Sequence, residues 1–334
     1  MKNKIAIASA FLAASSFSMG EIVVNDFLSF EGFIDSSYST SQSDIEGDKE
    51  SDNSFGVDQV EISWLFNFDA VTAQIDLEYE DGDQGNNDGV EQAFVNYALG
   101  NGDVITAGRY ASMLGFEAYE PTGLYQYSTA YSLDGQAITL ASQYVQGVKY
   151  TRSTDTIFFG ISLQDQAFGN DGDRFGGDVE GDSSYAVEVA GSIDLGNGFT
   201  VFAGGAFEDA ETGDNQLLNI YVTYETGAWL FAAELNLEEN ESDFFGDKGE
   251  ATSTLLMANY AYSDVASVTA RMSRVDFELN DAEVLDFTKY TVAHNHALSD
   301  NLLLVTEVSF DDGELGGFAD GENLTFAAEL LFSF

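Results

Sequence analysis

Apolar and polar residues alternate along most of the chain after its first twenty residues. Between positions 71 and 79, Val, Ala, Ile, Leu and Tyr occupy the odd positions, whereas Thr, Gln, Asp and Glu occupy the even ones. Residues 229–238 and 324–334 repeat this pattern. A period of two places successive side chains on opposite faces of a β-strand, so each segment predicts a strand with one apolar and one polar face. Such strands suit a sandwich in water and a barrel in a membrane equally well.

The connections between strands favour the barrel. We predict strands at residues 27–38, 55–68, 71–80, 90–99, 103–110, 143–152, 156–164, 184–194, 199–207, 217–225, 228–238, 251–262, 265–275, 285–297, 302–310 and 323–334. Connections after the even-numbered strands are short, whereas those after the odd-numbered strands are long, as at 39–54 and 111–142. An even strand number with short turns at one end and long loops at the other is typical of outer-membrane barrels. The sequence therefore predicts an all-β fold, a transmembrane antiparallel β-barrel of about 16 strands (14 to 18), with short periplasmic turns and long extracellular loops.

The two ends of the chain also indicate an exported, closed barrel. Residues 1–20 combine Lys2 and Lys4 with a short apolar stretch and small residues at Ser18 and Gly20, the pattern of a cleaved secretory signal peptide. Residues 21–334 would then form one barrel domain. Phe334 ends the last alternating strand. A terminal aromatic residue in this place resembles the signal that the barrel-assembly machinery reads in outer-membrane proteins.

Composition narrows the classes of function. The chain has 58 acidic and 11 basic residues and a net charge of −47. This charge excludes a nucleic-acid-binding protein that relies on contacts with the phosphate backbone. It has no cysteine, and its two histidines, His294 and His296, lie two residues apart with no third metal ligand indicated. We therefore predict no enzyme, no cofactor and no metal site.

More than half of the acidic residues fall in the predicted long loops. Loops outside the cell would form an acidic rim that concentrates cations and repels anions. The same excess of acids would also suit solubility in a saline habitat, and both interpretations stay open. The run at 170–182 does not fit the spacing of an EF-hand, although divalent cations could bridge such loops to lipopolysaccharide.

The longest connection, residues 111–142, differs from its acidic neighbours. It is rich in apolar and aromatic residues, and it has three acids, Glu117, Glu120 and Asp134. An apolar loop packs against another surface rather than standing free in water. We expect this third long loop to fold into the lumen and narrow it; the alternatives are an outer cap or a contact between subunits.

Two strands beside this loop resemble the OmpL-like putative β-barrel porin family. Residues 91–97 read Glu-Gln-Ala-Phe-Val-Asn-Tyr, residues 105–110 read Ile-Thr-Ala-Gly-Arg-Tyr, and Gly115-Phe-Glu117 follows. The family commonly shows an E-Q-A-Y-V strand, an L-G-K/R-F strand and a later G-x-E. Phe94 and Tyr110 stand where the family has other aromatic residues. The resemblance implies a Gram-negative outer-membrane channel for passive diffusion.

Strand parity predicts a set of charged side chains in the lumen, since a charge facing lipid costs ~2–4 kcal/mol at mid-membrane. The candidates by parity are the bases Lys149, Arg271 and Lys289 and the wall acids Asp76, Glu78, Glu188, Glu234, Glu307 and Glu329. Arg109, which directly precedes the third long loop, and the loop acids Glu117, Glu120 and Asp134 complete the set. Basic wall groups that face loop carboxylates filter ions. Alternatively, these charges pair with one another and only stabilise the lumen.

We therefore expect an outer-membrane porin for ions and small hydrophilic solutes, with a preference for cations. The alternative is a structural or adhesive barrel whose acidic loops bind a partner and which has no open pore. The expected partners are outer-membrane lipids, lipopolysaccharide and the barrel-assembly machinery, together with a homotrimer by analogy with general porins.

Overall fold

The computed structural model describes residues 20–80, 89–133, 136–137, 141–168, 185–210, 213–241, 248–280, 282–315 and 319–334. The predicted signal peptide therefore lies outside the described residues except for Gly20, and so do Asp134 and the acidic run at 170–182. Among the described residues, no helix is both long and apolar enough to cross a membrane.

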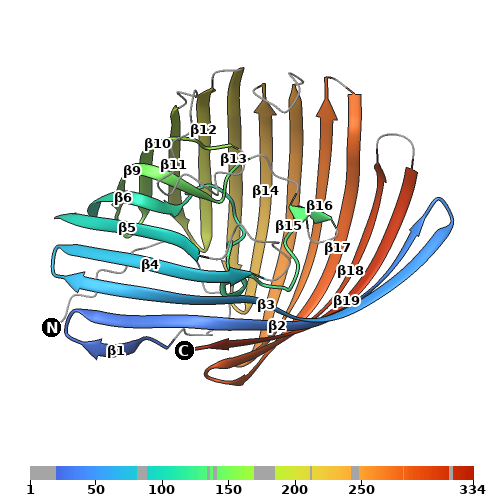
Figure 1. Cartoon of the computed structure of the whole chain (residues 1–334), viewed down its shortest axis with the longest axis horizontal. Coiled ribbons are helices and arrows are strands. Elements are labelled where there is room, and N and C mark those ends of the chain that lie inside the picture. The colour runs from blue at the N-terminus through green and yellow to red at the C-terminus, as the bar shows by residue number, and fades with distance from the viewer. Residues whose placement is uncertain are drawn as a thin grey trace.

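Sixteen antiparallel strands form a closed barrel, as predicted (Figure 1). They are β2 (Leu28–Ile45), β3 (Asp48–Phe68), β4 (Val71–Glu80), β5 (Gly89–Gly100), β6 (Asp103–Ala111), β9 (Tyr144–Ser153), β10 (Ile157–Gln164), β11 (Tyr185–Gly196), β12 (Phe199–Ala210), β13 (Gly213–Thr226), β14 (Trp229–Asn240), β15 (Gly249–Ser263), β16 (Ala266–Leu279), β17 (Ala282–Ser299), β18 (Leu302–Leu315) and β19 (Ala319–Ser333). Each strand pairs with the next one in this order, and β19 pairs with β2 to close the ring.

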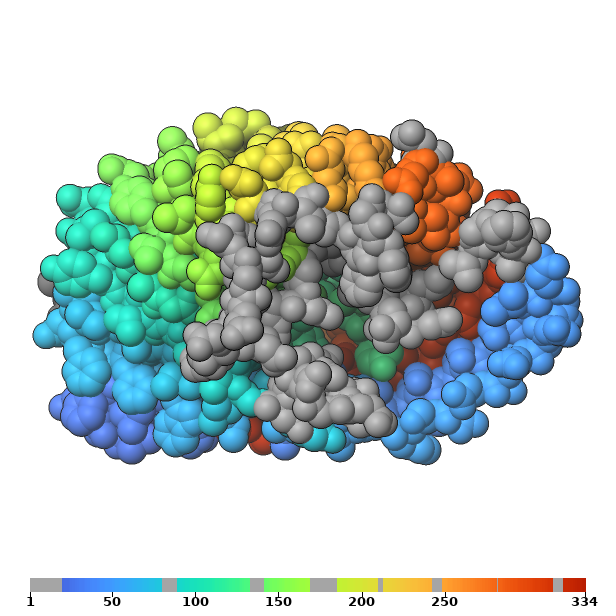
Figure 2. All heavy atoms as spheres, turned by 45° about the horizontal axis from the view of Figure 1, so that its top comes forward, coloured from blue at the N-terminus to red at the C-terminus, as the bar shows by residue number. Residues whose placement is uncertain are grey.

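Four short elements complete the described structure. Strand β1 (Ile22–Asn25) pairs with the start of β2. Between β6 and β9 lie a single 3₁₀ turn, η1 (Pro121–Gly123), and a small ribbon of β7 (Ser132–Leu133) and β8 (Gln136–Ala137). Figure 2, which looks onto the side of the long connections, shows the strands as an oval wall around the interior.

Burial follows the alternation that the sequence displays. On β4, Ile75 and Leu77 are exposed on the outside, whereas Asp76 between them is completely buried. Aromatic residues gather on the outer face beside the short turns, where Trp229 stacks on Tyr260 with ring centroids 4.5 Å apart. An apolar outer band with aromatic residues at its edge is what a lipid environment requires.

The last residue lies in the seam that closes the barrel. The Phe334 amide donates to the Gly32 carbonyl at 3.0 Å, and the Gly32 amide donates back at 2.9 Å. Any side chain at position 32 would collide with this seam, because a Cβ there would lie 2.4 Å from the Glu61 carbonyl oxygen and 2.9 Å from the Phe334 ring. Phe334 thus takes part in closure, while its role in assembly stays a prediction.

Several predicted loops are strands instead. The expected loop at 39–54 is a tall hairpin in which β2 and β3 run to a turn at Glu46 and Gly47, with φ angles of 56° and 91°. The expected loops at 208–216, 276–284 and 311–322 are likewise mostly strand. Beyond the lipid both faces of a strand meet water, so no apolar alternation marks these residues, although their backbone pairing continues.

Candidate functional site

The segment of residues 112–132, which follows β6, crosses the interior of the barrel (Figure 1). Its described residues form hydrogen bonds with strands far apart around the ring: Tyr127 with Ser37 of β2 at 3.2 Å, Gly115 with Asn219 of β13 at 3.1 Å, and Tyr125 with Asn295 of β17 at 3.0 Å. A single segment can contact strands this far apart around the ring only if it lies inside the barrel.

Two wall acids accept hydrogen bonds from the start of this segment. The Glu188 carboxylate on β11 accepts the Met113 amide at 2.7 Å and the Ser112 hydroxyl at 2.8 Å. The Glu234 carboxylate on β14 accepts the Phe116 amide at 2.7 Å. These two predicted lumen residues therefore satisfy donors of the segment and fasten it to the wall.

Further along the segment the same arrangement recurs on the C-terminal strands. Glu307 of β18 accepts the Ser128 amide at 3.1 Å. Lys289 of β17 donates to the Ser132 carbonyl at 3.1 Å and lies 4.0 Å from Asp311. Side chains of the wall thus replace the water that would otherwise solvate the backbone of the segment.

A buried ion pair joins the middle of the segment to the wall. Arg271 on β16 has no exposed side-chain surface, and its Nη1 lies 2.5 Å from Oε1 of Glu117. Arg271 also donates to the Ser128 hydroxyl at 3.1 Å, and the second Glu117 oxygen accepts the Ala130 amide at 2.7 Å. The two charges are fully paired, so this contact orders the segment without adding net charge to the lumen.

Two other predicted bases lie close to where the segment begins. Lys149 of β9 donates to the Ala111 carbonyl at 3.3 Å, and its ammonium is 4.3 Å from the centre of the Tyr110 ring. Arg109 shares the strand parity of the exposed Ile105, and its Nε donates to the Glu91 carbonyl at 2.7 Å. Both bases therefore donate hydrogen bonds to main-chain carbonyl oxygens, and these bonds hold the C-terminal end of β6 in place.

Carboxylates gather where the segment passes β3, β4 and β5. One oxygen from each of Glu61, Glu91 and Glu120 lies within 4.8 Å of the others. The Gln59 amide bridges this group to β4, since it donates to Glu78 at 2.6 Å and to Glu120 at 2.8 Å. Burial raises the pKa of the Glu120 carboxyl, although Tyr144 and Gln59 donate hydrogen bonds that oppose this rise.

The remaining predicted residues have separate positions. Asp76, on the inner face of β4, accepts hydrogen bonds from Gln74 at 3.0 Å and Gln92 at 2.8 Å. Glu329 is buried on β19, opposite Ser37 of β2 in the pairing register. The structure thus collects the predicted charges in several groups around the segment rather than in one facing pair of rows.

Sequence reasoning missed Glu61, Glu91 and Asn219. Glu61 shares the inward parity of Ser63, which donates to it at 2.7 Å, so parity alone could have found it. No sequence signal marked Asn219 beyond its polar face. Parity could not identify Glu91, because a local irregularity in β5 changes the direction of the Glu91 side chain.

Aromatic packing accounts for the apolar character of the segment. Phe116 contacts Tyr221 of β13 with ring centroids 5.7 Å apart, and Phe116 and Tyr125 are parallel at 6.5 Å. Leu114 belongs to a buried cluster with Phe168 and Phe202. The apolar residues therefore pack against the wall and against one another.

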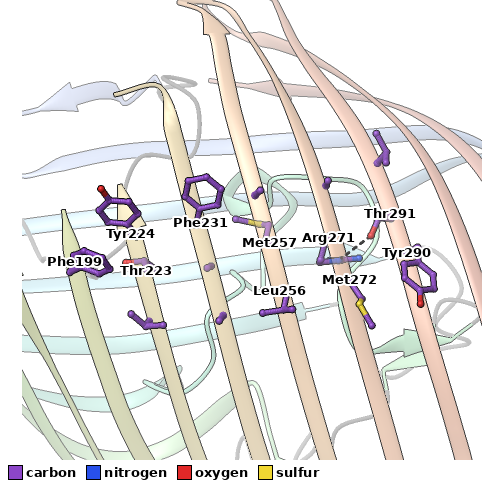
Figure 3. A pocket seen from close by; sticks show the side chains of 16 residues that line it. Phe199, Thr223, Tyr224, Phe231, Leu256, Met257, Arg271, Met272, Tyr290 and Thr291 are labelled. Carbon is purple, nitrogen blue, oxygen red and sulfur yellow. Dashed lines mark hydrogen bonds between the residues drawn. The ribbon is translucent and has the colours of Figure 1, made fainter. Parts of the chain in front are cut away.

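An apolar hollow of about 630 Å³ lies on the barrel between β12 and β17 (Figure 3). Exposed side chains border it, among them Phe231, Leu256, Met272 and Tyr290. The buried Arg271 and Thr291 also line it, and they bond each other at 3.2 Å. Its apolar border matches the outer band, so acyl chains suit it better than polar solutes.

Comparisons with known proteins agree with this architecture. A family model described as putative beta-barrel porin-2, OmpL-like, matches residues 28–334, which confirms the resemblance found in the sequence. No curated protein sequence matches the chain. Similar solved structures include the outer membrane channel DcaP of Acinetobacter baumannii, at 11% identity, 92% and 97% coverage of this chain and that chain, and a TM-score of 0.67.

Two further similar structures are described by a trimer form in one case and by anion selectivity in the other. OmpT, an outer membrane protein of Vibrio cholerae described in a trimer form, is 15% identical, with 92% of this chain and 99% of that chain covered and a TM-score of 0.61. An anion-selective porin from Comamonas acidovorans is 16% identical, with 92% and 99% covered and a TM-score of 0.60. At these identities the likeness shows a shared fold.

Proposed function

The chain belongs to the OmpL-like putative beta-barrel porin-2 family, and from this premise we propose that it is a passive diffusion channel for ions and small hydrophilic solutes. The family and the structural neighbours point to the outer membrane. The observation that carries the proposal is the interior segment 112–132, which polar wall side chains hold across a closed barrel. Such a segment sets the width of the passage, and solutes cross with no chemical step.

Cation preference follows from the balance of charge along this path. Within the described residues, the buried charged side chains are mostly carboxylates, and Arg271 and Lys289 are the buried bases. At the rim, Asp44, Glu46, Glu283, Asp312 and Glu322 help to line an open hollow of about 900 Å³. Carboxylates at an entrance raise the local cation concentration. A neighbour of this fold is described as anion-selective, so charge rather than fold would set the preference.

Two further parts of the proposal concern maturation and assembly. We expect export to remove residues 1–20, which leaves Glu21 as the first residue of the mature chain. A homotrimer is proposed because a neighbour of the same fold is described in a trimer form. Mass spectrometry of the mature protein and sedimentation in detergent measure these two properties directly.

Liposome swelling tests the channel itself. Purified, folded protein in liposomes should admit sugars at rates that fall steeply as the sugar grows, because the interior segment limits the width. Liposomes with heat-denatured protein serve as the control. If folded protein admits none of the sugars, the passage is closed, and the structural or adhesive alternative takes its place.

A further inference from the structure

Three carboxylates from different parts of the chain converge on the inner wall. Glu61 lies on β3, Glu91 on β5 and Glu120 immediately before η1 in the interior segment. One oxygen of each lies within 4.8 Å of the other two. The Glu61 and Glu91 residues are 5% and 9% exposed, so most of their contact with water is lost.

A β-bulge places Glu91 in this group. Across β4 and β5 the register runs from Asp76 opposite Gln92 to Leu77 opposite Val90, which leaves Glu91 without an opposite residue. Simple alternation would give Glu91 the outward direction of the exposed Val95. A bulge redirects a side chain, and bulges occur often beside functional sites. The backbone is therefore shaped so that this carboxylate joins the other two.

Each carboxylate of the wall keeps one oxygen without a donor. Oε2 of Glu61 and Oε2 of Glu91 are buried and have no hydrogen-bond partner within the part of the chain that the structure describes. Oε1 of Glu61, by contrast, accepts the Ser63 hydroxyl at 2.7 Å. A buried carboxylate oxygen without a partner is costly, so it points to a group that the protein chain does not itself supply.

The donors that hold the group do not offset its charge. Ser63 binds Glu61, whereas Gln59 and Tyr144 bind Glu120, and all three donors are neutral. Glu78, which the same Gln59 amide binds, brings a further carboxylate. Like charges at this separation in a partly dry site repel strongly, and a cation relieves that repulsion.

We propose that Glu61, Glu91 and Glu120 bind one Ca²⁺ ion, which clamps the interior segment to β3 and β5. Hard oxygen ligands without sulfur or imidazole suit Ca²⁺ and Mg²⁺ rather than Zn²⁺. Ligands at about 2.3–2.6 Å from Ca²⁺ lie up to roughly 5 Å apart, whereas the octahedral shell of Mg²⁺ is tighter. The three oxygens, all within 4.8 Å of one another, fit around one Ca²⁺ ion with water completing its coordination. Mg²⁺ is less suited because it loses its water reluctantly and is usually bound by one or two carboxylates.

This clamp adds a further attachment of the segment to the wall. Arg271 and Glu117 fasten its middle to β16, and the ion would fasten the stretch before η1 to β3 and β5. Removal of Ca²⁺ leaves the three carboxylates to repel one another and loosens this end of the segment. Calcium in the medium would then stabilise the narrow state of the passage, an effect that rests on the proposed channel function.

Calcium binding is measured without any channel assay. Folded, chelator-treated protein is titrated with CaCl₂ in excess MgCl₂ by calorimetry, together with the single variants Glu91→Gln and Glu120→Gln. We expect one site with clear preference for Ca²⁺ and at least tenfold weaker binding in either variant. Glu120→Gln lies outside the barrel strands, so it keeps the test informative if Glu91→Gln does not fold.

A rim variant controls for adventitious binding. Glu46→Gln/Glu322→Gln removes two carboxylates from the acidic hollow at the rim and leaves the buried group intact. It should retain the preferred site. Loss of calcium binding in the rim variant, with normal binding in both cluster variants, would overturn the proposal. Calcium binding without any solute passage would instead refute the channel function and leave the site standing.

Discussion

Replacement of Arg271 by glutamine tests how firmly the interior segment is attached. At 2.5 Å from Glu117 and with an effective dielectric constant near 20, the attraction is roughly 7 kcal/mol before desolvation is subtracted. Removal of one partner from such a buried pair leaves the other charge uncompensated and costs about 3–5 kcal/mol. About 3 kcal/mol corresponds to a more than hundredfold larger population of the detached segment.

An exposed ion pair between β16 and β17 offers a matched control for the buried one. Arg274 also lies on β16, and its Nη2 is 2.5 Å from Asp286 of β17, but its side chain is 50% exposed. An exposed pair of the same length contributes about 0–1 kcal/mol, because water already solvates both charges. Arg274→Gln should therefore leave the interior segment attached as in the wild type.

Hydrogen exchange read by mass spectrometry measures local detachment. Peptides that cover residues 113–132 should exchange at least a hundredfold faster in Arg271→Gln and less than about fivefold faster in Arg274→Gln. The double variant Arg271→Gln/Glu117→Gln should be less affected than the sum of its single variants, since no unpaired charge remains. Equal exchange in the two arginine variants would refute the argument that burial makes the Arg271 pair strong.

Three further outcomes follow from the structure. Gly32→Val should reduce the folded fraction in a heat-modifiability gel, because its side chain would displace the Phe334 seam, and folding at the wild-type level would contradict this steric argument. Glu120 faces Glu61, Glu91 and Asp76, and burial raises the pKa of its carboxyl. The protonated carboxyl therefore stabilises the folded protein at acidic pH, and this contribution is lost as the pH rises through the raised pKa. In calcium-free buffer, protection of the interior segment from exchange should therefore fall as pH rises above the ordinary range of a glutamate, and Glu120→Gln should weaken that trend. Neutralisation of Asp44, Glu283 and Asp312 should lower the cation-to-anion permeability ratio several-fold in dilute salt but little at 1 M, where charges are screened; the same loss at both concentrations would exclude a rim effect.

The strands could be predicted because lipid imposes a strict rule on them. A strand such as β14 must show apolar residues outward for its full membrane depth, and its alternation is therefore visible in the sequence. The rule ends where the lipid ends. Residues 39–54 alternate between two wetted faces, so the hairpin of β2 and β3 was hidden in what looked like a loop.

The site was predicted less completely because its geometry depends on the path of one segment. Glu234 and Glu307 accept hydrogen bonds from backbone amides of residues 112–132, and only the path of this segment brings those amides to them. The bulge at Glu91 reverses the parity rule at one residue. Bulges depend on pairing between strands rather than on a local pattern, so a single sequence did not reveal it.

Single-channel recording in a planar bilayer tests the central claim most directly. Folded protein under a KCl gradient should give steady openings, and the reversal potential should lie on the cation side because carboxylates dominate the rim and the buried wall charges. Arg271→Gln should add noise to the open level as its segment detaches. A silent bilayer with correctly folded protein would contradict the channel, and a reversal potential on the anion side would contradict its proposed selectivity.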